Sequence, residues 1–246
     1  MAVDWAVVRS TLALFLVAGS WVKFTEWLGA RVSIELSRKA LHIGIGLLYL
    51  GCWLAFYSPA CSSCRYWASL VPLAVTLKIA LVGAGWLRDE AMVRSMSRSS
   101  RSGELLRGPL HYGLIFIANT WLFWGYRPHA ILSLILLCVG DGMAALVPTW
   151  VRAQYRVRLP YNRNKSLVGL VAFVLSATVV GAAYLEAFER LDWFERSRWH
   201  ASGPFDVYRV GVVALGAGLV ESATSSEYDN LLVFGVGLVL SELMYG

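Results

Sequence analysis

Residues 167–187 read LVGLVAFVLSATVVGAAYLEA, and this apolar stretch decides the class of fold. A helix needs about 20 predominantly apolar residues to cross the hydrocarbon core of a bilayer, and the stretch holds 21. The glycines inside it are compatible with this assignment, because membrane helices use small residues for close packing. The stretch therefore predicts a transmembrane helix.

Similar apolar runs occur along the rest of the chain. They cover Trp5–Val22, Leu41–Tyr57, Trp67–Leu87, Leu110–Trp124, Ala130–Val147, Val207–Val220 and Leu231–Tyr245. The second run of the chain and the last two are short, so we expect seven or eight transmembrane helices. No strand-like alternation persists. We therefore expect residues 1–246 to form one domain, an all-α polytopic integral membrane bundle.

The composition supports a membrane protein. The chain is 57% hydrophobic and 15% charged, whereas a soluble domain is roughly 45–50% apolar and about 25% charged. The N-terminal run lacks a basic n-region, so we expect a retained helix and not a signal peptide. Cys61 and Cys64 form a CxxC, for which a plain loop or a local disulfide is favoured over a metal site.

Positive charge is distributed unequally between the two sets of loops. With eight helices, residues 23–40, 88–109, 149–166 and 221–230 share one face, which holds fourteen Lys and Arg, against five on the other face. The positive-inside bias places the first face in the cytosol or its topological equivalent. The basic balance of the chain therefore indicates membrane topology and an anionic substrate, and not nucleic acid.

The polar clusters of the sequence fall on that same face. Asp141 lies between two glycines in GDG, and an acid within membrane sequence costs about 2.5–3.5 kcal/mol, which makes a functional role the default. Its carboxylate is suited to hold a metal beside a phosphate. Glu221, Glu227 and Asp229 add acids in a loop of this otherwise basic face. These acids suggest ligands for a shared metal ion, or a base that removes the proton of a hydroxyl group.

Three basic segments on this face suit phosphate binding. They are ELSRKALHIG at 35–44, the loop 88–109, and RVRLPYNRNKSLVG at 156–169. Arg grips phosphate through a planar fork and Lys through a point charge. Anchoring of helix ends by basic residues remains an alternative for Arg38 and Lys39, and a solvated loop for residues 88–109. A positive-inside flank remains one for residues 156–169, although a mere flank does not need the Asn residues or the Pro-Tyr pair. No GxxxxGK[ST] and no protein-kinase signature occurs.

Five segments in this order resemble the phytol kinase and farnesol kinase family, whose members are CTP-dependent polyprenol kinases related to dolichol kinase. They are ELSRKALHIG, DEAMVRSM with ELLRGPL, GDGMA, LPYNRNKSLVG and the DNL of EYDNL. The resemblance covers roughly residues 34–240. It implies a multi-pass enzyme of plastid or other endomembranes that uses CTP and Mg²⁺ to phosphorylate phytol, farnesol or geranylgeraniol. It also implies a role in isoprenoid salvage and tocopherol synthesis.

The polar clusters and the resemblance together give expected roles for individual residues. The expected catalytic residues are Asp141, Lys165, Asp229 and His42. The expected nucleotide-binding residues are Arg38, Lys39, Asn162, Arg163, Asn164 and Lys165. The expected metal ligands are Asp141, Glu221 and Asp229. Asp229, Asp89 and His42 are the candidates for the base that takes the proton of the alcohol.

The sequence departs from the family pattern at two places. A second acid is expected shortly after GDG, where this chain has Met143-Ala144-Ala145, and further acids are expected at Ser226 and Tyr228. Glu227 or Glu221 could compensate for them. A catalytically impaired membrane paralogue is therefore one alternative. A transporter is another, because Arg9 and Lys78 lie inside predicted spans.

Overall fold

The computed structural model describes residues 4–124, 127–194, 207–224 and 228–245. It consists of helices that divide into two compact units, Met1–Trp124 and Gly125–Gly246. Within the described residues no strand longer than an isolated bridge occurs. The expected all-α class is thus confirmed, and the assignment of one domain to residues 1–246 stays a prediction.

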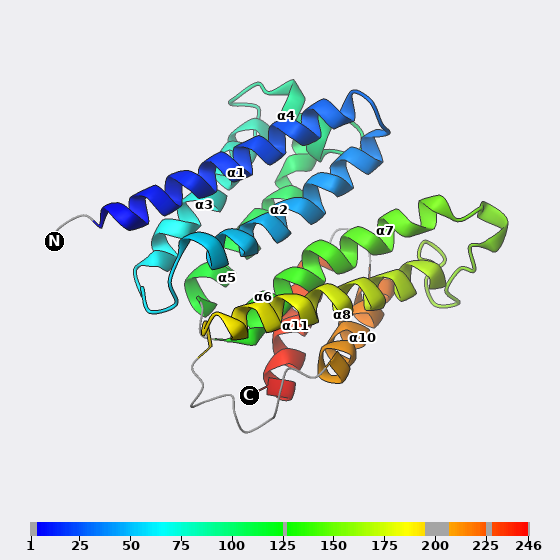
Figure 1. Ribbon diagram of the computed structural model, residues 1–246. Coiled ribbons are helices and arrows are strands. Elements are labelled where there is room, and N and C mark those ends of the chain that lie inside the picture. Colours follow the sequence, from blue (N-terminus) through cyan, green and yellow to red (C-terminus); the bar gives the residue numbers. More distant parts are fainter. Residues whose placement is uncertain (1–3, 125–126, 195–206, 225–227, 246) are drawn as a thin grey trace. The chain divides into compact units, whose positions relative to one another are not determined.

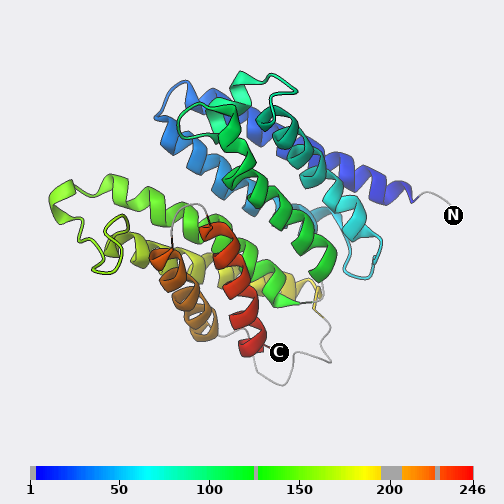
Figure 2. The same ribbon diagram turned by 180° about the vertical axis from the view of Figure 1, so that it is seen from behind.

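The first unit is built from four long helices. They are α1 (Trp5–Gly29), α2 (Ile34–Phe56), α3 (Cys64–Gly83) and α5 (Gly108–Phe123), with the short helices α4 (Glu90–Met96) and η1 (Ser102–Leu106) between α3 and α5. Helix α1 packs on α2, and α3 packs on α5 (Figures 1 and 2). Cys61 and Cys64 form a disulfide at the start of α3, as one sequence alternative proposed.

The second unit surrounds one buried helical run. Residues 128–150 form α6 (Pro128–Ile135), the π-helical turn η2 (Leu136–Gly140) and α7 (Asp141–Trp150), and every residue of α6 and η2 is buried. This run is contacted by α8 (Leu167–Arg190), α10 (Val207–Ala223) and α11 (Asp229–Tyr245), as Figures 1 and 2 show. A short helix, η3 (Ala153–Tyr155), follows α7. The centre of this unit is therefore the segment that carries GDG.

Among the residues that the structure describes, five helical segments are long and apolar enough to span a membrane. They are Trp5–Gly29, Ile34–Phe56, Cys64–Gly83, Pro128–Trp150 and Leu167–Arg190. The other three apolar runs correspond to α5, α10 and α11, which have 16 or 17 residues. The polytopic helical architecture is confirmed, while the number of seven or eight crossings stays a prediction.

One boundary differs from the sequence prediction. The apolar run Trp67–Leu87 predicts a helix to its end, but α3 ends at Gly83. Gly85 has a φ of +79°, a left-handed conformation that glycine adopts without strain and that commonly ends a helix. The amides of Trp86 and Leu87 both donate to the carbonyl of Leu81, which satisfies the last turn of α3.

Close packing at Gly140 yields a stability prediction. A Cβ added there would lie 2.7 Å from the ring of Phe173, a fully buried residue of α8. Overpacking of this kind typically costs 1–3 kcal/mol, so we expect Gly140→Ala to lower the free energy of unfolding by about 1–3 kcal/mol. The thermal midpoint of the detergent-solubilised chain measures this change.

Gly235→Ala is the matched control, because a Cβ at Gly235 of α11 meets nothing within 4 Å. Alanine is a better helix former than glycine by about 1 kcal/mol, so this variant is expected to melt no lower than the wild type. Equal midpoints for the two variants would show that Phe173 moves aside at no cost.

Candidate active site

Three acids from distant parts of the sequence meet in the second unit. Asp141 is the first residue of α7, Glu221 lies in the last turn of α10, and Asp229 is the first residue of α11. Each offers a carboxylate oxygen within 4.8 Å of those of the other two, and all three side chains are buried. The structure thus brings together the three residues that the sequence nominated as metal ligands.

The π-helical turn η2 immediately precedes Asp141. The amide of Asp141 donates to the carbonyl of Leu136, five residues earlier, where an α-helix would use the residue four earlier. Such a bulge rotates the side chains that follow it, and π-bulges occur frequently at functional sites. The orientation of Asp141 therefore depends on an irregular turn that the sequence analysis did not predict.

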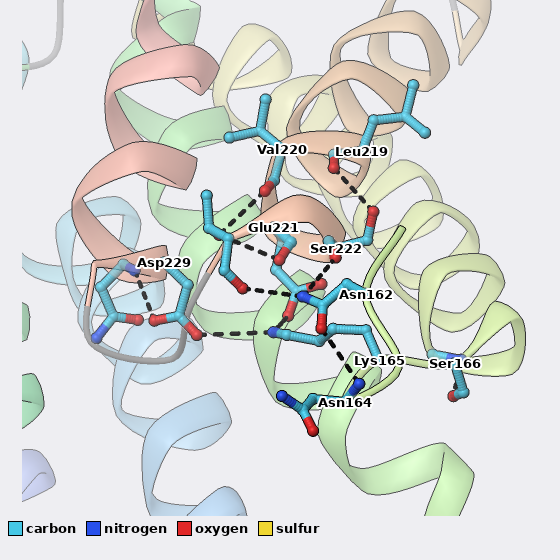
Figure 3. A network of polar contacts seen from close by, with 12 residues as sticks. Asn162, Asn164, Lys165, Ser166, Leu219, Val220, Glu221, Ser222 and Asp229 are labelled. Carbon is cyan, nitrogen blue, oxygen red and sulfur yellow. Dashed lines mark hydrogen bonds and ion pairs between the residues drawn. The ribbon is translucent and has the colours of Figure 1, made fainter. Parts of the chain in front are cut away.

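Lys165 lies between two of these acids. Its Nζ donates to the Oε1 atom of Glu221 and is 3.7 Å from Oδ2 of Asp229, as the dashed lines in Figure 3 show. Burial by itself opposes the charged form, but the charge and hydrogen bond of Glu221, with Asp229 and Asp141, outweigh it and raise the pKa of Lys165. The ammonium group is therefore protonated at neutral pH.

A hairpin-like loop holds Lys165 in this place. The amide of Leu159 donates to the carbonyl of Lys165 at 3.1 Å, and the amide of Leu167 donates to that of Val157 at 2.9 Å. Ser166 then caps α8, with its hydroxyl accepting the amide of Gly169. Lys165 is consequently fixed by paired backbone on one side and by the start of α8 on the other.

The tip of this loop is attached to the end of α10. Nδ2 of Asn162 donates to the carbonyls of Ser222 and Thr224 at 3.1 and 3.3 Å, and Figure 3 shows Asn162 beside Ser222. The Tyr161 hydroxyl is 2.8 Å from the Ser222 hydroxyl. These bonds satisfy carbonyls at the end of a helix, which otherwise lack partners. The structure therefore gives Asn162 a positioning contact, and its predicted binding of nucleotide stays a prediction.

Two further predicted binding residues stand at the loop tip. Arg163 and Asn164 are exposed, and the amide of Asn164 donates to Oδ1 of Asn162 at 3.2 Å. Their side chains are accessible to a ligand outside the loop. Tyr161 and Ser222 were not predicted as site residues; the sequence signal for Tyr161 was the Pro-Tyr pair, which a mere basic flank does not need.

The other predicted site residues belong to the first unit. Arg38, Lys39 and His42 lie on α2, and Lys39 is buried. The carbonyl of His42 accepts a hydrogen bond from the Tyr112 hydroxyl at 2.8 Å, and the two rings are in contact. The roles expected of these three residues stay predictions.

Asp89, one candidate base, has structural partners in the first unit. It is 2.6 Å from Lys78 Nζ and accepts the amide of Met92, which caps α4. The hydrogen bond from Lys78, followed by that of Met92, lowers the pKa of Asp89. Both contacts make Asp89 a weaker base, and they also give Lys78 an acid to pair with. Glu227 and Ser226 lie outside the described residues.

Several curated plant proteins are similar to the chain over most of its length. It is 36% identical to a probable phytol kinase 2, chloroplastic, of Oryza sativa subsp. japonica, over 93% of this chain and 73% of the relative. It is 33% identical to a farnesol kinase, chloroplastic, of Arabidopsis thaliana, over 92% of this chain and 71% of the relative. It is 30% identical to phytol kinase 1, chloroplastic, of the same plant, over 97% and 77%. No protein-family model and no solved structure matches the chain.

Proposed function

The chain belongs to the phytol kinase and farnesol kinase family, and on this premise we propose that it transfers the γ-phosphoryl group of CTP to an isoprenoid alcohol. Members of this family are phosphotransferases that act on an alcohol, and a kinase needs a nucleotide donor. The relatives are named chloroplastic, so we propose a plastid membrane as the location. The product, a monophosphate of phytol, farnesol or geranylgeraniol, would serve isoprenoid salvage and tocopherol synthesis.

The observation that carries the site assignment is the meeting of Asp141, Glu221 and Asp229 around Lys165. Three buried carboxylates within 4.8 Å of one another, with an ammonium group beside two of them, supply in one place ligands for a metal ion and a cation for a phosphate oxygen. Such an arrangement is suited to a reaction that moves negative charge. Phosphoryl transfer is chemistry of this kind, because it depends on positioning and on charge neutralisation.

The donor set fits Mg²⁺. Carboxylate oxygens are the ligands that this hard cation prefers, and it usually binds through one or two carboxylates together with the phosphates of a substrate. Asp141 and Glu221 would hold it, with Asp229 as a third ligand or as the base. When bound, Mg²⁺ would supply charge neutralisation at the nucleotide phosphates.

The remaining steps fall to side chains of the second unit. Lys165 would bind an oxygen of the transferred group, and Arg163 at the loop tip would bind the outer phosphates. Asp229, at the start of α11, would accept the proton of the alcohol. The alcohol oxygen would attack the γ-phosphorus, and CDP would leave. Asn162 and Tyr161 would keep the loop against α10 during turnover.

The acceptor would reach this site from the lipid. Helix α8 begins two residues after Lys165 and exposes Leu167, Val171, Leu175 and Val179, which follow one another at a spacing of four. This spacing places them on one face of the helix. A prenyl tail could lie along that face with its hydroxyl near Lys165.

A panel of substrates tests the proposal. Membranes that contain the chain are supplied with phytol, farnesol or geranylgeraniol and with each of four labelled nucleoside triphosphates, and labelled prenyl monophosphate is measured. We expect product with CTP and an isoprenoid alcohol, and at least tenfold less after chelation of divalent cations. Transfer from ATP but not CTP would refute the donor assignment.

A catalytically impaired paralogue is the second candidate, favoured by Ala145 in place of an expected acid. Its signature in the same membranes is nucleotide binding without product. The transporter alternative has lost part of its basis, because Lys78 forms an ion pair with Asp89. Flux of substrate through proteoliposomes without nucleotide would restore that alternative.

A further inference from the structure

The segment 84–107 of the first unit, here named the basic arch, connects α3 to α5 and exposes only arginines as cations. It contains no lysine, and all of its arginines are exposed: Arg88, Arg94, Arg98, Arg101 and Arg107. Arginine binds oxyanions bidentately and is more weakly hydrated than lysine. The arch therefore presents several groups suited to phosphate-like oxygens on one short segment.

The arch begins with an exposed aromatic side chain. The left-handed turn at Gly85 ends α3, and Trp86 directly after it is 83% exposed, with Leu87 exposed beside it. Tryptophan is enriched where the membrane meets water, because its ring is apolar and its N–H is polar. At the end of a membrane-spanning helix this exposure indicates a position at the level of the lipid headgroups.

Glu104 gives the arch a defined fold. Its carboxylate accepts the backbone amides of Arg98 and Ser99 at 2.7 and 3.1 Å, and also the Ser99 hydroxyl. The turn next to these bonds includes Ser100 with a φ of +57°, an uncommon conformation for a residue other than glycine. The loop between α4 and η1 is thus ordered around one acid.

Apolar contacts fasten the arch to the helices below. Leu105 and Met92 are buried in a cluster with Ile79 and Val82 of α3. Leu106 lies so close to Gly83 that an added Cβ there would meet it at 2.7 Å. The exposed arginines therefore project from a platform with a fixed position on α3.

Two acids of the arch are directed to partners within the protein. Asp89 pairs with Lys78 and caps α4, and Glu104 binds the loop amides. The negative charge of both carboxylates therefore faces partners within the first unit. Glu90, the third acid of the arch, is exposed, but the exposed arginines outnumber it. The outer surface of the arch is consequently cationic.

We propose that the basic arch binds lipids with anionic headgroups at the surface of the leaflet from which it projects. Trp86 and Leu87 enter the interface, and Arg94, Arg98 and Arg101 contact headgroup oxygens. The positive-inside bias by itself accounts for the positive charge of the arch. It does not require an ordered loop, an exposed tryptophan, or arginine in place of lysine. This inference is independent of the proposed kinase activity, because it concerns lipid binding only.

Lipid titration of the detergent-solubilised full chain tests the proposal. Short-chain phosphatidylglycerol and phosphatidylcholine are the probes, and the dissociation constant is measured for each. We expect at least tenfold tighter binding of phosphatidylglycerol, with this preference lost at high salt. Each arginine near an anionic surface strengthens lipid binding. The triple variant R94Q/R98Q/R101Q should therefore bind phosphatidylglycerol on the order of a hundredfold more weakly.

Two variants control for charge and for loop order. R190Q removes an exposed arginine at the end of α8, and we expect it to bind both lipids as the wild type does. E104A keeps all arginines of the arch but removes the acid that orders the loop, and we expect about tenfold weaker binding of phosphatidylglycerol. Wild-type affinity in the triple variant would overturn the proposal. The proposal would also be overturned if CTP competed with phosphatidylglycerol and the triple variant no longer bound CTP. In that case the arch would bind the nucleotide and not a lipid headgroup.

Discussion

Asp141→Asn is expected to lower the transfer of phosphate to the alcohol by about 100- to 1,000-fold. Asparagine has nearly the same shape, so the packing beneath η2 is retained while the negative charge is removed. Loss of one electrostatic group that acts in the transition state typically costs this much in kcat. Labelled prenyl monophosphate formed per minute in membranes is the measurement.

A matched control separates this effect from the loss of a negative charge elsewhere in the protein. Glu186 is an exposed acid of α8 that pairs with Arg190, so Glu186→Gln should leave the rate within twofold of the wild type. A second readout is independent of turnover. At 100 times its dissociation constant, Mg²⁺ should stabilise the wild type by about 2.7 kcal/mol and the Asp141→Asn variant by much less. Unchanged rate and unchanged Mg²⁺ stabilisation would remove Asp141 from the site.

The membrane-spanning architecture could be predicted because its physical basis is local. A stretch such as 167–187 must be helical in lipid, since only a helix satisfies its own backbone there. The boundaries were less certain, as α3 shows: a single glycine with positive φ ended it before Trp86. Turn conformations of this kind depend on one residue and carry little periodic signal.

The acids of the site could be nominated because a carboxylate beside a membrane span is costly and stands out. Their meeting required the fold, since Asp141 and Glu221 are 80 residues apart in sequence. The π-helical turn before Asp141 was not predictable, because the apolar residues 136–140 are compatible with an ordinary helix. The contacts of Asn162 with α10 could not be predicted either. In the sequence its amide stands next to cations, which suggests a phosphate ligand and gives no sign of the distant helix that it contacts.

Lys165→Met is expected to affect both activity and stability. A cation placed on the transferred phosphoryl group contributes about 10³–10⁵ in rate in related chemistry, so we expect kcat/KM to fall by at least about a thousandfold. The substitution also leaves the buried Glu221 without its ammonium partner. Removing one member of a buried ion pair costs about 3–5 kcal/mol, so the thermal midpoint should fall as well.

The double variant Lys165→Met/Glu221→Gln distinguishes these two roles of Lys165. With Glu221 neutral as well, the carboxylate that had lost its hydrogen-bonded ammonium partner no longer carries charge, so much of the lost stability should return although Asp229 stays charged. Phosphoryl transfer should stay below the wild-type rate by the same thousandfold or more. Lys23→Met is the control for the loss of a lysine, because Lys23 is exposed and solvent screens its ion pair with Glu26. Recovery of both stability and activity in the double variant would mean that Lys165 only balances Glu221. Recovery of stability alone shows that the lost rate does not come from a structural deficit. If the single variant Glu221→Gln, which loses only the metal ligand, then keeps more of the rate than the double variant does, the difference belongs to the ammonium group of Lys165.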